Sequence, residues 1–150
     1  MSTPGITLMS VYGFELTPDD NDTFLITVPL LPEATSFSET KEQAQNYARL
    51  AIEEAIAARI RGGLDVPAEP NAPDAGYIVV MPLMTSLKVD LYNTARAHGV
   101  NRAELARRLG WNRNSVDRLF LLDHNSRLEQ LDAAFKALGA RIDARVVEFV

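Results

Sequence analysis

The stretch Arg102–Phe120, RAELARRLGWNRNSVDRLF, decides the fold of the second half of this chain. Apolar residues recur at helical spacing as far as Leu109, and Gly110 follows them as a residue that readily takes the positive φ found at a helix end. Asn101 with Glu104 fits a capping pair for this first helix, and Asn112 can then cap a second helix. The stretch predicts two short helices joined by a tight turn, with the small Ala106 allowing the helices to cross closely.

The offsets between the small, glycine and apolar residues resemble the helix-turn-helix of bacterial repressors, whose second helix enters the major groove of DNA. A helical hairpin without DNA-binding function would explain the leucines but not the polar outer face of the second helix. Arg can contact guanine, Asn adenine, and Ser a base or a phosphate. Arg102, Arg107 and Arg108 are placed to meet backbone phosphates. The residues predicted to bind DNA are Arg102, Asn112, Arg113, Asn114, Ser115 and Arg118.

The composition is typical of a soluble globular protein with one large or two small domains. The chain has 150 residues, of which 47% are hydrophobic and 23% charged. No apolar run is long enough to cross a bilayer, and the first residues do not resemble a secretory signal. The sequence contains no cysteine, which excludes disulfides and cysteine-ligated zinc and fits a cytoplasmic protein.

Charge is divided unevenly along the chain. Residues 1–85 hold four basic and twelve acidic side chains, a net charge of −8, whereas residues 86–150 hold eleven basic and eight acidic ones, a net charge of +3. The basic excess falls around the two-helix stretch, and an acidic half suits a basic protein partner better than nucleic acid. Many small domains are acidic merely for solubility, so charge alone does not establish such a partner.

A long helix is the clearest element of the first half. Thr40 with Gln43 fits a capping box, and an apolar stripe that includes Tyr47 continues to Ile60 before Gly62 ends the helix. Because a lone sheet cannot bury its apolar side, we expect this helix to cover one face of a sheet. The strands of that sheet are predicted at 6–16, 23–28, 34–37 and, as a central strand, 77–81.

The second half predicts a helical domain, with its boundary at residue 82. The first helix is expected over residues 83–98, and a capping box of Ser126 and Glu129 predicts the start of a further helix after the two-helix stretch. Trp111, just after the turn, is expected to serve mainly as a core residue rather than to stack on DNA.

The last ten residues alternate between apolar and charged side chains, which predicts a terminal strand over Arg141–Val150. The backbone hydrogen bonds of this strand need a partner, because the rest of its domain is helical. A second copy of the chain is the simplest partner. The residues predicted to mediate dimerisation are Ile142, Ala144 and Val146.

We predict no catalytic, cofactor-binding or metal site. The acidic turn at 19–22 lacks the central glycine and closing glutamate of a calcium loop. His98 and His124 lie far apart in sequence without a neighbouring acidic cluster. An active metal nuclease would need several carboxylates converging on the sheet, and Glu15 has no convincing companions. We therefore expect that the protein is not an enzyme.

Several motifs recur together in one known family. Residues 36–44, SFSETKEQA, are similar to a Ser-x-Gly-Asp-Thr-x-Glu-Glu-Ala signature, with Ser38 and Glu39 in place of the glycine and aspartate. Leu31-Pro32-Glu33 stands where that family has Leu-Pro-Gly. With these motifs the chain resembles the HicB-type antitoxins of bacterial toxin–antitoxin pairs. The motifs of the second half are KVDLY at 88–92, AELARRLG at 103–110, SRLEQL at 126–131 and ALG at 137–139.

The resemblance implies an α+β fold in two domains. Residues 1–81 would form a partial ribonuclease-H-like β-β-β-α-β domain without nuclease activity, and residues 82–150 a helix-turn-helix domain with a terminal strand. It also implies that the first domain neutralises a HicA-like mRNA-cleaving toxin, while the second binds operator DNA and represses its own operon. The implied partners are the toxin, operator DNA and further copies in a homodimer or higher oligomer, without cofactor or membrane.

A different function remains open on the residues alone. The chain could be a stand-alone helix-turn-helix repressor whose first domain senses a small ligand. That function predicts a concave apolar pocket within the first domain and no toxin gene beside its own.

Overall fold

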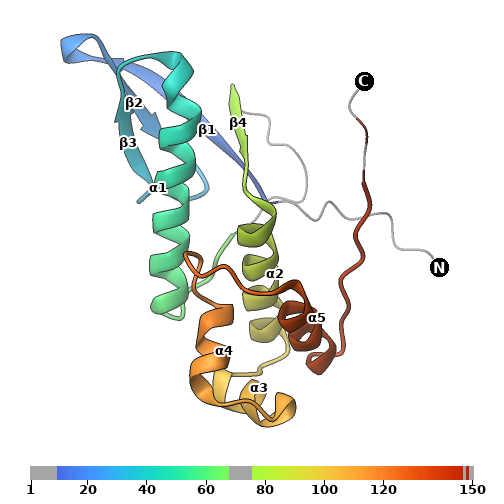
Figure 1. Ribbon diagram of the computed structural model, residues 1–150. Helices are drawn as coiled ribbons and strands as arrows, with labels where there is room; N and C mark the ends of the chain where they lie inside the picture. The colour runs from blue at the N-terminus through green and yellow to red at the C-terminus, as the bar shows by residue number, and fades with distance from the viewer. Residues whose placement is uncertain (1–9, 68–75, 147, 149–150) are drawn as a thin grey trace.

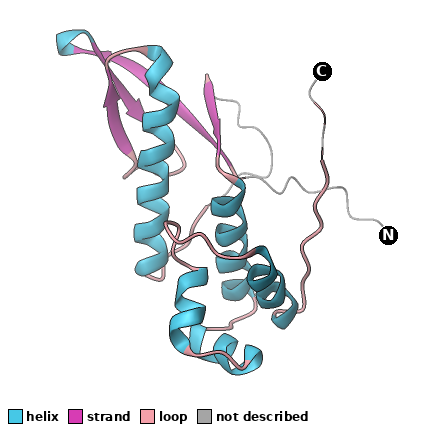
Figure 2. Cartoon of the chain, viewed as in Figure 1, coloured by secondary structure: helices cyan, strands magenta, loops and turns pink. Residues whose placement is uncertain are grey.

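The computed structural model describes residues 10–67, 76–146 and 148. Within them the chain forms a mixed α/β fold, with a sheet and one long helix at one end and four shorter helices at the other (Figure 1). Figure 2 shows that all strands lie at the sheet end. The order β-β-β-α-β of the first half is as expected from the sequence, and its ribonuclease-H-like relationship stays a prediction.

The sheet has four strands in the order β3-β2-β1-β4, and every neighbouring pair is antiparallel. The hairpin between β1 and β2 turns through a short 3-10 segment at Asp20–Asp22, where Asn21 has a φ of 72°. β1 continues to Asp19, so the turn is shorter than the sequence suggested, and residues 6–9 of the predicted strand lie outside the described residues. The strands are β1 (Val11–Asp19), β2 (Thr23–Thr27), β3 (Thr35–Ser38) and β4 (Tyr77–Val80).

β4 lies at an edge of the sheet, so the prediction of a central strand is wrong. Only Val79 is buried, whereas Tyr77, Ile78 and Val80 are each at least 39% exposed. Tyr77 covers part of its surface by stacking on Phe14, with ring centroids 5.3 Å apart. A short apolar run has the same appearance in sequence whether one or both of its faces are covered, because periodicity does not record neighbouring strands.

Helix α1 (Lys41–Arg61) covers one face of the sheet. Thr40 caps it as predicted, accepting a hydrogen bond from the Gln43 amide at 3.3 Å. Alanines along the buried stripe let the helix approach the strands closely, and burial of each isoleucine contributes about 2 kcal/mol. Tyr47 points outward and is 40% exposed, so it is not part of the stripe. The buried residues are Ala44, Ala48, Ile52, Ala55, Ile56 and Ile60.

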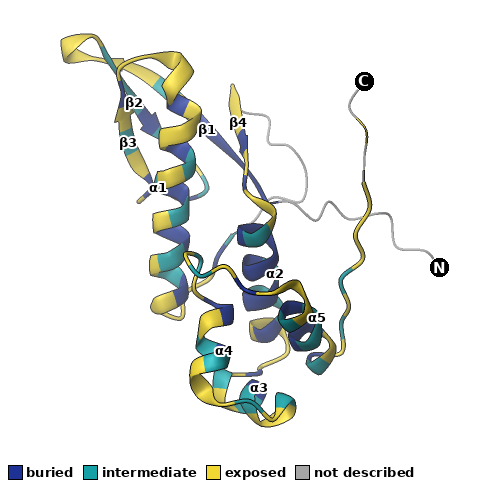
Figure 3. Ribbon diagram, viewed as in Figure 1, coloured by how far each residue is buried: buried dark blue, intermediate teal, exposed yellow. Residues whose placement is uncertain are grey.

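Helix α2 (Leu83–Ala97) leads directly from the sheet to the other helices. Ser10, immediately before β1, fixes the start of α2: the Met81 amide donates to the Ser10 carbonyl at 2.9 Å, and the Ser10 amide donates to Ser86 Oγ at 2.9 Å. Buried side chains form one continuous cluster from the sheet to the last helix (Figure 3). The division into two domains at residue 82 therefore stays a prediction.

Helices α3 (Arg102–Leu109), α4 (Arg113–Leu119) and α5 (Leu128–Ala137) complete the fold. The predicted capping box before α5 is wrong, because the N-cap position falls on Arg127, which makes no capping bond. Ser126 is buried instead, and its hydroxyl donates to the Arg118 carbonyl at 3.5 Å.

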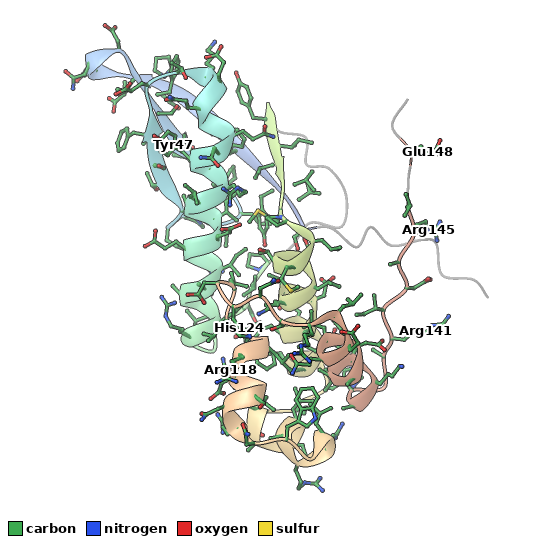
Figure 4. All side chains as sticks on the ribbon, viewed as in Figure 1. Tyr47, Arg118, His124, Arg141, Arg145 and Glu148 are labelled. Carbon is green, nitrogen blue, oxygen red and sulfur yellow. The ribbon has the colours of Figure 1, made fainter. Side chains whose placement is uncertain are left out.

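The segment after α5 is extended but forms no strand within the described residues 141–146 and 148. Ile142 packs against the core, whereas Ala144 is exposed and Val146 is 96% exposed. Figure 4 shows Arg141, Arg145 and Glu148 projecting along this tail, away from the helices. The expected terminal strand is therefore not formed by the described part of the single chain. Its pairing with a second copy stays a prediction.

Candidate nucleic-acid interface

Helices α3 and α4 are joined by a three-residue turn with well-defined ends. Asn101 caps α3 by accepting from the Glu104 amide at 2.8 Å, and Asn112 caps α4 by accepting from the Ser115 amide at 2.8 Å. Between them Gly110 takes a φ of 70°, the left-handed conformation that glycine adopts without strain. Both caps and the glycine are where the sequence predicts them.

One face of α4 is committed to packing. Val116 and Leu119 are buried, and they lie against a core that includes Leu105 of α3. Trp111 is partly buried and packs against the same core, as expected. The polar side chains of α4 must therefore point outward or along its flanks.

The outward face of α4 carries the side chains that the sequence assigned to DNA. Arg113, Asn114 and Arg118 are exposed and Ser115 is partly buried. The Arg118 side chain makes no hydrogen bond or ion pair within the described part of the chain and projects from the helix (Figure 4). Asn112 is also exposed, but its side-chain oxygen is occupied by the cap. Helical spacing places Asn114 and Arg118 opposite the buried residues, at the centre of this face.

Asp117 lies among these arginines and was missed by the sequence analysis. Its carboxylate accepts from Arg113 Nε at 3.1 Å and from Arg102 Nη1 at 3.0 Å. Burial favours a raised pKa for Asp117, but the hydrogen bonds from both guanidinium groups outweigh it and lower the pKa. Arg102 also lies over the Phe120 ring, 4.9 Å from its centroid. The i, i+4 spacing of Arg113 and Asp117 was the signal available in the sequence.

The other two arginines proposed for phosphates lie on α3. Arg107 forms an ion pair with Glu104 on the surface, and Arg108 donates to the Ala137 carbonyl at 3.0 Å. Both remain exposed. Surface ion pairs of this kind are weak, so a phosphate can replace the carboxylate at little cost.

Lys88, in the middle of α2, is the second residue that the sequence analysis did not place in the site. Its side chain is fully buried, and Nζ donates to the carbonyls of Arg118, Leu121 and His124. Burial lowers the pKa of Lys88 to about 8, against the opposing charge of Asp123. A lysine flanked by Leu87 and Val89 on an apolar helix was a signal for such a buried role.

A groove of about 930 Å³ lies between the end of α1, α2 and the α3–α4 pair. Residues Ile60, Arg61 and Gly63 of the first half line one side of it, and the rest of its lining comes from the second half, so it is not a pocket within the first half such as a ligand-sensing repressor would need. Tyr92 and Phe120, packed edge-to-face with centroids 6.3 Å apart, form part of its wall. The arginines that line it are Arg61, Arg96, Arg102 and Arg113.

The described residues offer no group of three or more histidine or acidic side chains that could hold a metal ion. In the same residues, no helix is both long and apolar enough to pass through a membrane.

Comparison with known proteins places the chain in a family. Residues 11–90 match the family model described as HicB-like antitoxin of bacterial toxin–antitoxin systems. The match covers β1 through the first half of α2 and thus includes Lys88. The chain belongs to this HicB-like antitoxin family.

Individual relatives extend over nearly the whole chain. Antitoxin HicB of Pseudomonas fluorescens (strain Pf0-1) is 32% identical over 136 residues, which cover 90% of this chain and 92% of the relative. Antitoxin HicB of Escherichia coli (strain K12) is 27% identical, covering 91% and 99%. The crystal structure of the N-terminal domain of Burkholderia pseudomallei antitoxin HicB is 24% identical, covers 49% of this chain and 94% of that one, and has a TM-score of 0.35.

Proposed function

We propose that this antitoxin neutralises a HicA-like mRNA-cleaving toxin through its sheet domain and represses its own operon through α3 and α4. In this proposal α3–turn–α4 is a helix-turn-helix, and α4 lies in the major groove of operator DNA, which places the protein in the cytoplasm. The protein acts by binding and performs no catalysis. Family membership supports the antitoxin role, and the geometry of α4 supports the DNA-binding role.

The observation that carries the DNA-binding role is the division of α4 into two faces. Val116 and Leu119 are buried, while Asn114 and Arg118 stand exposed on the opposite side of the helix. Asparagine and arginine are the side chains best suited to bidentate contacts with adenine and guanine. Arg113 and Arg102 exchange the Asp117 carboxylate for phosphates when DNA is bound.

Operator binding by the full chain tests this role. We expect Arg113→Ala and Arg118→Ala to abolish binding to the operon's own promoter fragment, measured by fluorescence anisotropy, and to leave toxin neutralisation intact. Arg49→Ala is the matched control, because Arg49 lies on α1 and pairs with Glu53. Wild-type affinity in both α4 variants would refute the assignment.

The acidic first half supports the toxin-binding role. Residues 1–85 carry a net charge of −8, and the tip of the β1–β2 hairpin exposes Asp19, Asp20 and Asp22. A toxin that binds RNA needs a basic surface, which an acidic surface attracts and covers. Co-expression with the small toxin encoded in the adjacent reading frame tests this role, and growth arrest despite a co-purifying antitoxin would argue against it.

A dimer would present two copies of α4 to successive major grooves, about 34 Å apart on a palindromic site. We propose that Ile142, Ala144 and Val146 pair with the same segment of a second copy. Val146 is 96% exposed in the single chain, as an unpaired interface residue would be. Sedimentation of Ile142→Glu should give a monomer at micromolar concentration, and an unchanged dimer would contradict this pairing.

A further inference from the structure

We propose that Lys88 is a positioning residue for DNA binding, which holds the C-terminal end of α4 against α2 and so sets the orientation of the face that carries Asn114 and Arg118. This inference rests on the proposed operator binding by α4. Lys88 is buried in α2 and is not part of the exposed face of α4, so its position alone does not suggest a role in DNA recognition.

The contacts of Lys88 are complete. Nζ donates at 3.0 Å to the carbonyl of Arg118, in the last turn of α4, and at 2.6 Å to the carbonyls of Leu121 and His124 in the following loop. An ammonium group has three hydrogens, and each has one acceptor here. The Arg118 carbonyl also accepts from the Leu121 amide and the Ser126 hydroxyl, and the Leu121 carbonyl from the His124 amide, so an apolar side chain at this position would remove the third donor from the first, the second from the next, and the side-chain donor of the His124 carbonyl.

α4 needs such an external support because it is short. It spans the seven residues Arg113–Leu119, and its last carbonyls depend on donors from outside the helix: the Phe120 and Leu121 amides, the Ser126 hydroxyl and Lys88. A positive charge at a helix C-terminus also favours the helix dipole. Lys88 supplies both the hydrogen bonds and the charge, and its Arg118 contact lies at the backbone of the residue whose side chain faces DNA.

α2 is a suitable frame for this support, because it is fixed to other parts of the molecule. Ser86 accepts from the Ser10 amide beside β1, and the Tyr92 hydroxyl donates to the Leu64 carbonyl after α1, at 2.7 Å. Lys88 lies between these two attachments. The orientation of α4 is therefore defined relative to the sheet domain as well as to α3.

Protonation of Lys88 gives the proposal a distinctive signature. Burial lowers its pKa to about 8, so deprotonation at mildly alkaline pH removes one of three N–H donors. The charged and titratable groups around it are Asp123, which favours the ammonium, and Arg118 and His124 on the segment that it holds. From α1, Glu53, Glu54 and Arg61 line a shallow pocket against the 120–123 loop.

The experiment compares the full-length chain with Lys88→Met, which keeps the length of the side chain and removes the ammonium. Anisotropy with the promoter duplex is measured from pH 7 to 9.5 at constant salt. We expect Lys88→Met to bind at least tenfold more weakly at pH 7, and wild-type affinity to fall several-fold across this range while the variant's does not. Lys136→Met, on the exposed face of α5, is the matched control and should follow the wild type.

Amide hydrogen exchange of both proteins without DNA distinguishes this proposal from the proposed function. We expect exchange to accelerate at least tenfold in residues 113–121 of Lys88→Met and to stay unchanged in α1 and the sheet. Unchanged exchange in α4, or acceleration throughout the chain, would overturn the positioning role even if no DNA binds. A folded Lys88→Met with wild-type affinity, or a pH profile shared by both proteins, would overturn it as well.

Discussion

The two ends of this molecule hold their helices in opposite ways. α1 has 21 residues and lies on the sheet through a stripe of buried alanine and isoleucine side chains. α4 has seven residues and depends on a side-chain cap, two ion pairs to Asp117 and the buried ammonium of Lys88. α4 also packs through Val116 and Leu119, but a helix this short buries less apolar area, so directional contacts form a larger share of its support. Single polar substitutions should therefore affect α4 more than α1, and single apolar truncations should affect α1 strongly.

The largest effect should come from truncating the stripe of α1. Ile52 is fully buried, so Ile52→Ala should lower the free energy of unfolding by about 2–5 kcal/mol through lost transfer energy and a cavity. Denaturant unfolding followed by circular dichroism measures this loss. Leu50→Ala, two residues away and 46% exposed, is the control and should change stability by no more than about 0.5 kcal/mol. Equal losses in both variants would contradict the picture of a one-sided stripe.

The next effect concerns Asp117, which pairs with two arginines of the proposed DNA-binding surface. Asp117→Asn removes a negative charge from that surface and frees Arg102 and Arg113 for phosphates. Operator affinity should rise about threefold to tenfold at low salt, with the gain shrinking as salt is added. Asp132→Asn on α5, where Asp132 pairs with Lys136, should leave affinity unchanged. A loss of affinity in Asp117→Asn would mean that its ion pairs orient the arginines for DNA.

The two side-chain caps provide a matched pair. Asn112→Ala and Thr40→Ala each remove one capping bond, at a cost of about 1 kcal/mol. In the seven-residue α4 that loss should fray the helix and weaken operator binding, whereas in α1 the stripe holds the remaining turns. Parallel measurements of thermal unfolding and anisotropy check both outcomes. Weaker DNA binding in Thr40→Ala would show that the sheet end also shapes the DNA-binding surface.

The smallest effect should come from the ion pair between Glu33 and Arg59, at 2.5 Å, which ties the loop before β3 to the end of α1. The hydrogen bond from Arg59 lowers the pKa of Glu33 from 4.5 to about 2. A carboxylate whose pKa is lower in the folded than in the unfolded chain stabilises the fold at pH values above its unfolded pKa. That contribution to stability is lost as the pH falls from about 4.5 to 2.

Because Glu33 is 45% exposed, Glu33→Gln should cost no more than about 0.5–1 kcal/mol at pH 7. Urea unfolding at pH 7 and at pH 2.5 should show this difference at neutral pH and nearly none in acid. A stability difference that persists at pH 2.5 would mean that the packing of the Glu33 side chain, and not its charge, stabilises the contact with Arg59.

Local sequence rules predicted the parts of the fold that local interactions determine. The caps of Thr40, Asn101 and Asn112 and the left-handed Gly110 depend on residues within a few positions of one another. The stripe of α1 depends on periodicity alone. These features were predictable because other local structures would place these residues in backbone conformations that they disfavour.

The features that were missed depend on residues far apart in the chain. The edge position of β4 depends on which strands pair with one another. The roles of Lys88 and Ser126 depend on their lying close to the Arg118 carbonyl in the folded chain. Ser126 fits a capping box in sequence, but a buried carbonyl of α4 lies near enough to accept its hydroxyl. On α4, residue types predicted which face is exposed, while the ion pair between Asp117 and Arg102 of α3 appeared only in three dimensions.

Among the described residues no strand pairs with the outer side of β4, and this open edge affects how the protein behaves at high concentration. Backbone groups on an unpaired strand are a template on which another extended chain can add, which is the first step toward aggregates. The Gln45 side chain interrupts that template, because its amide already donates to the Ile78 carbonyl at 2.9 Å. An incoming strand must first displace this amide, so the exposed Gln45 of α1 hinders the addition of another strand at β4.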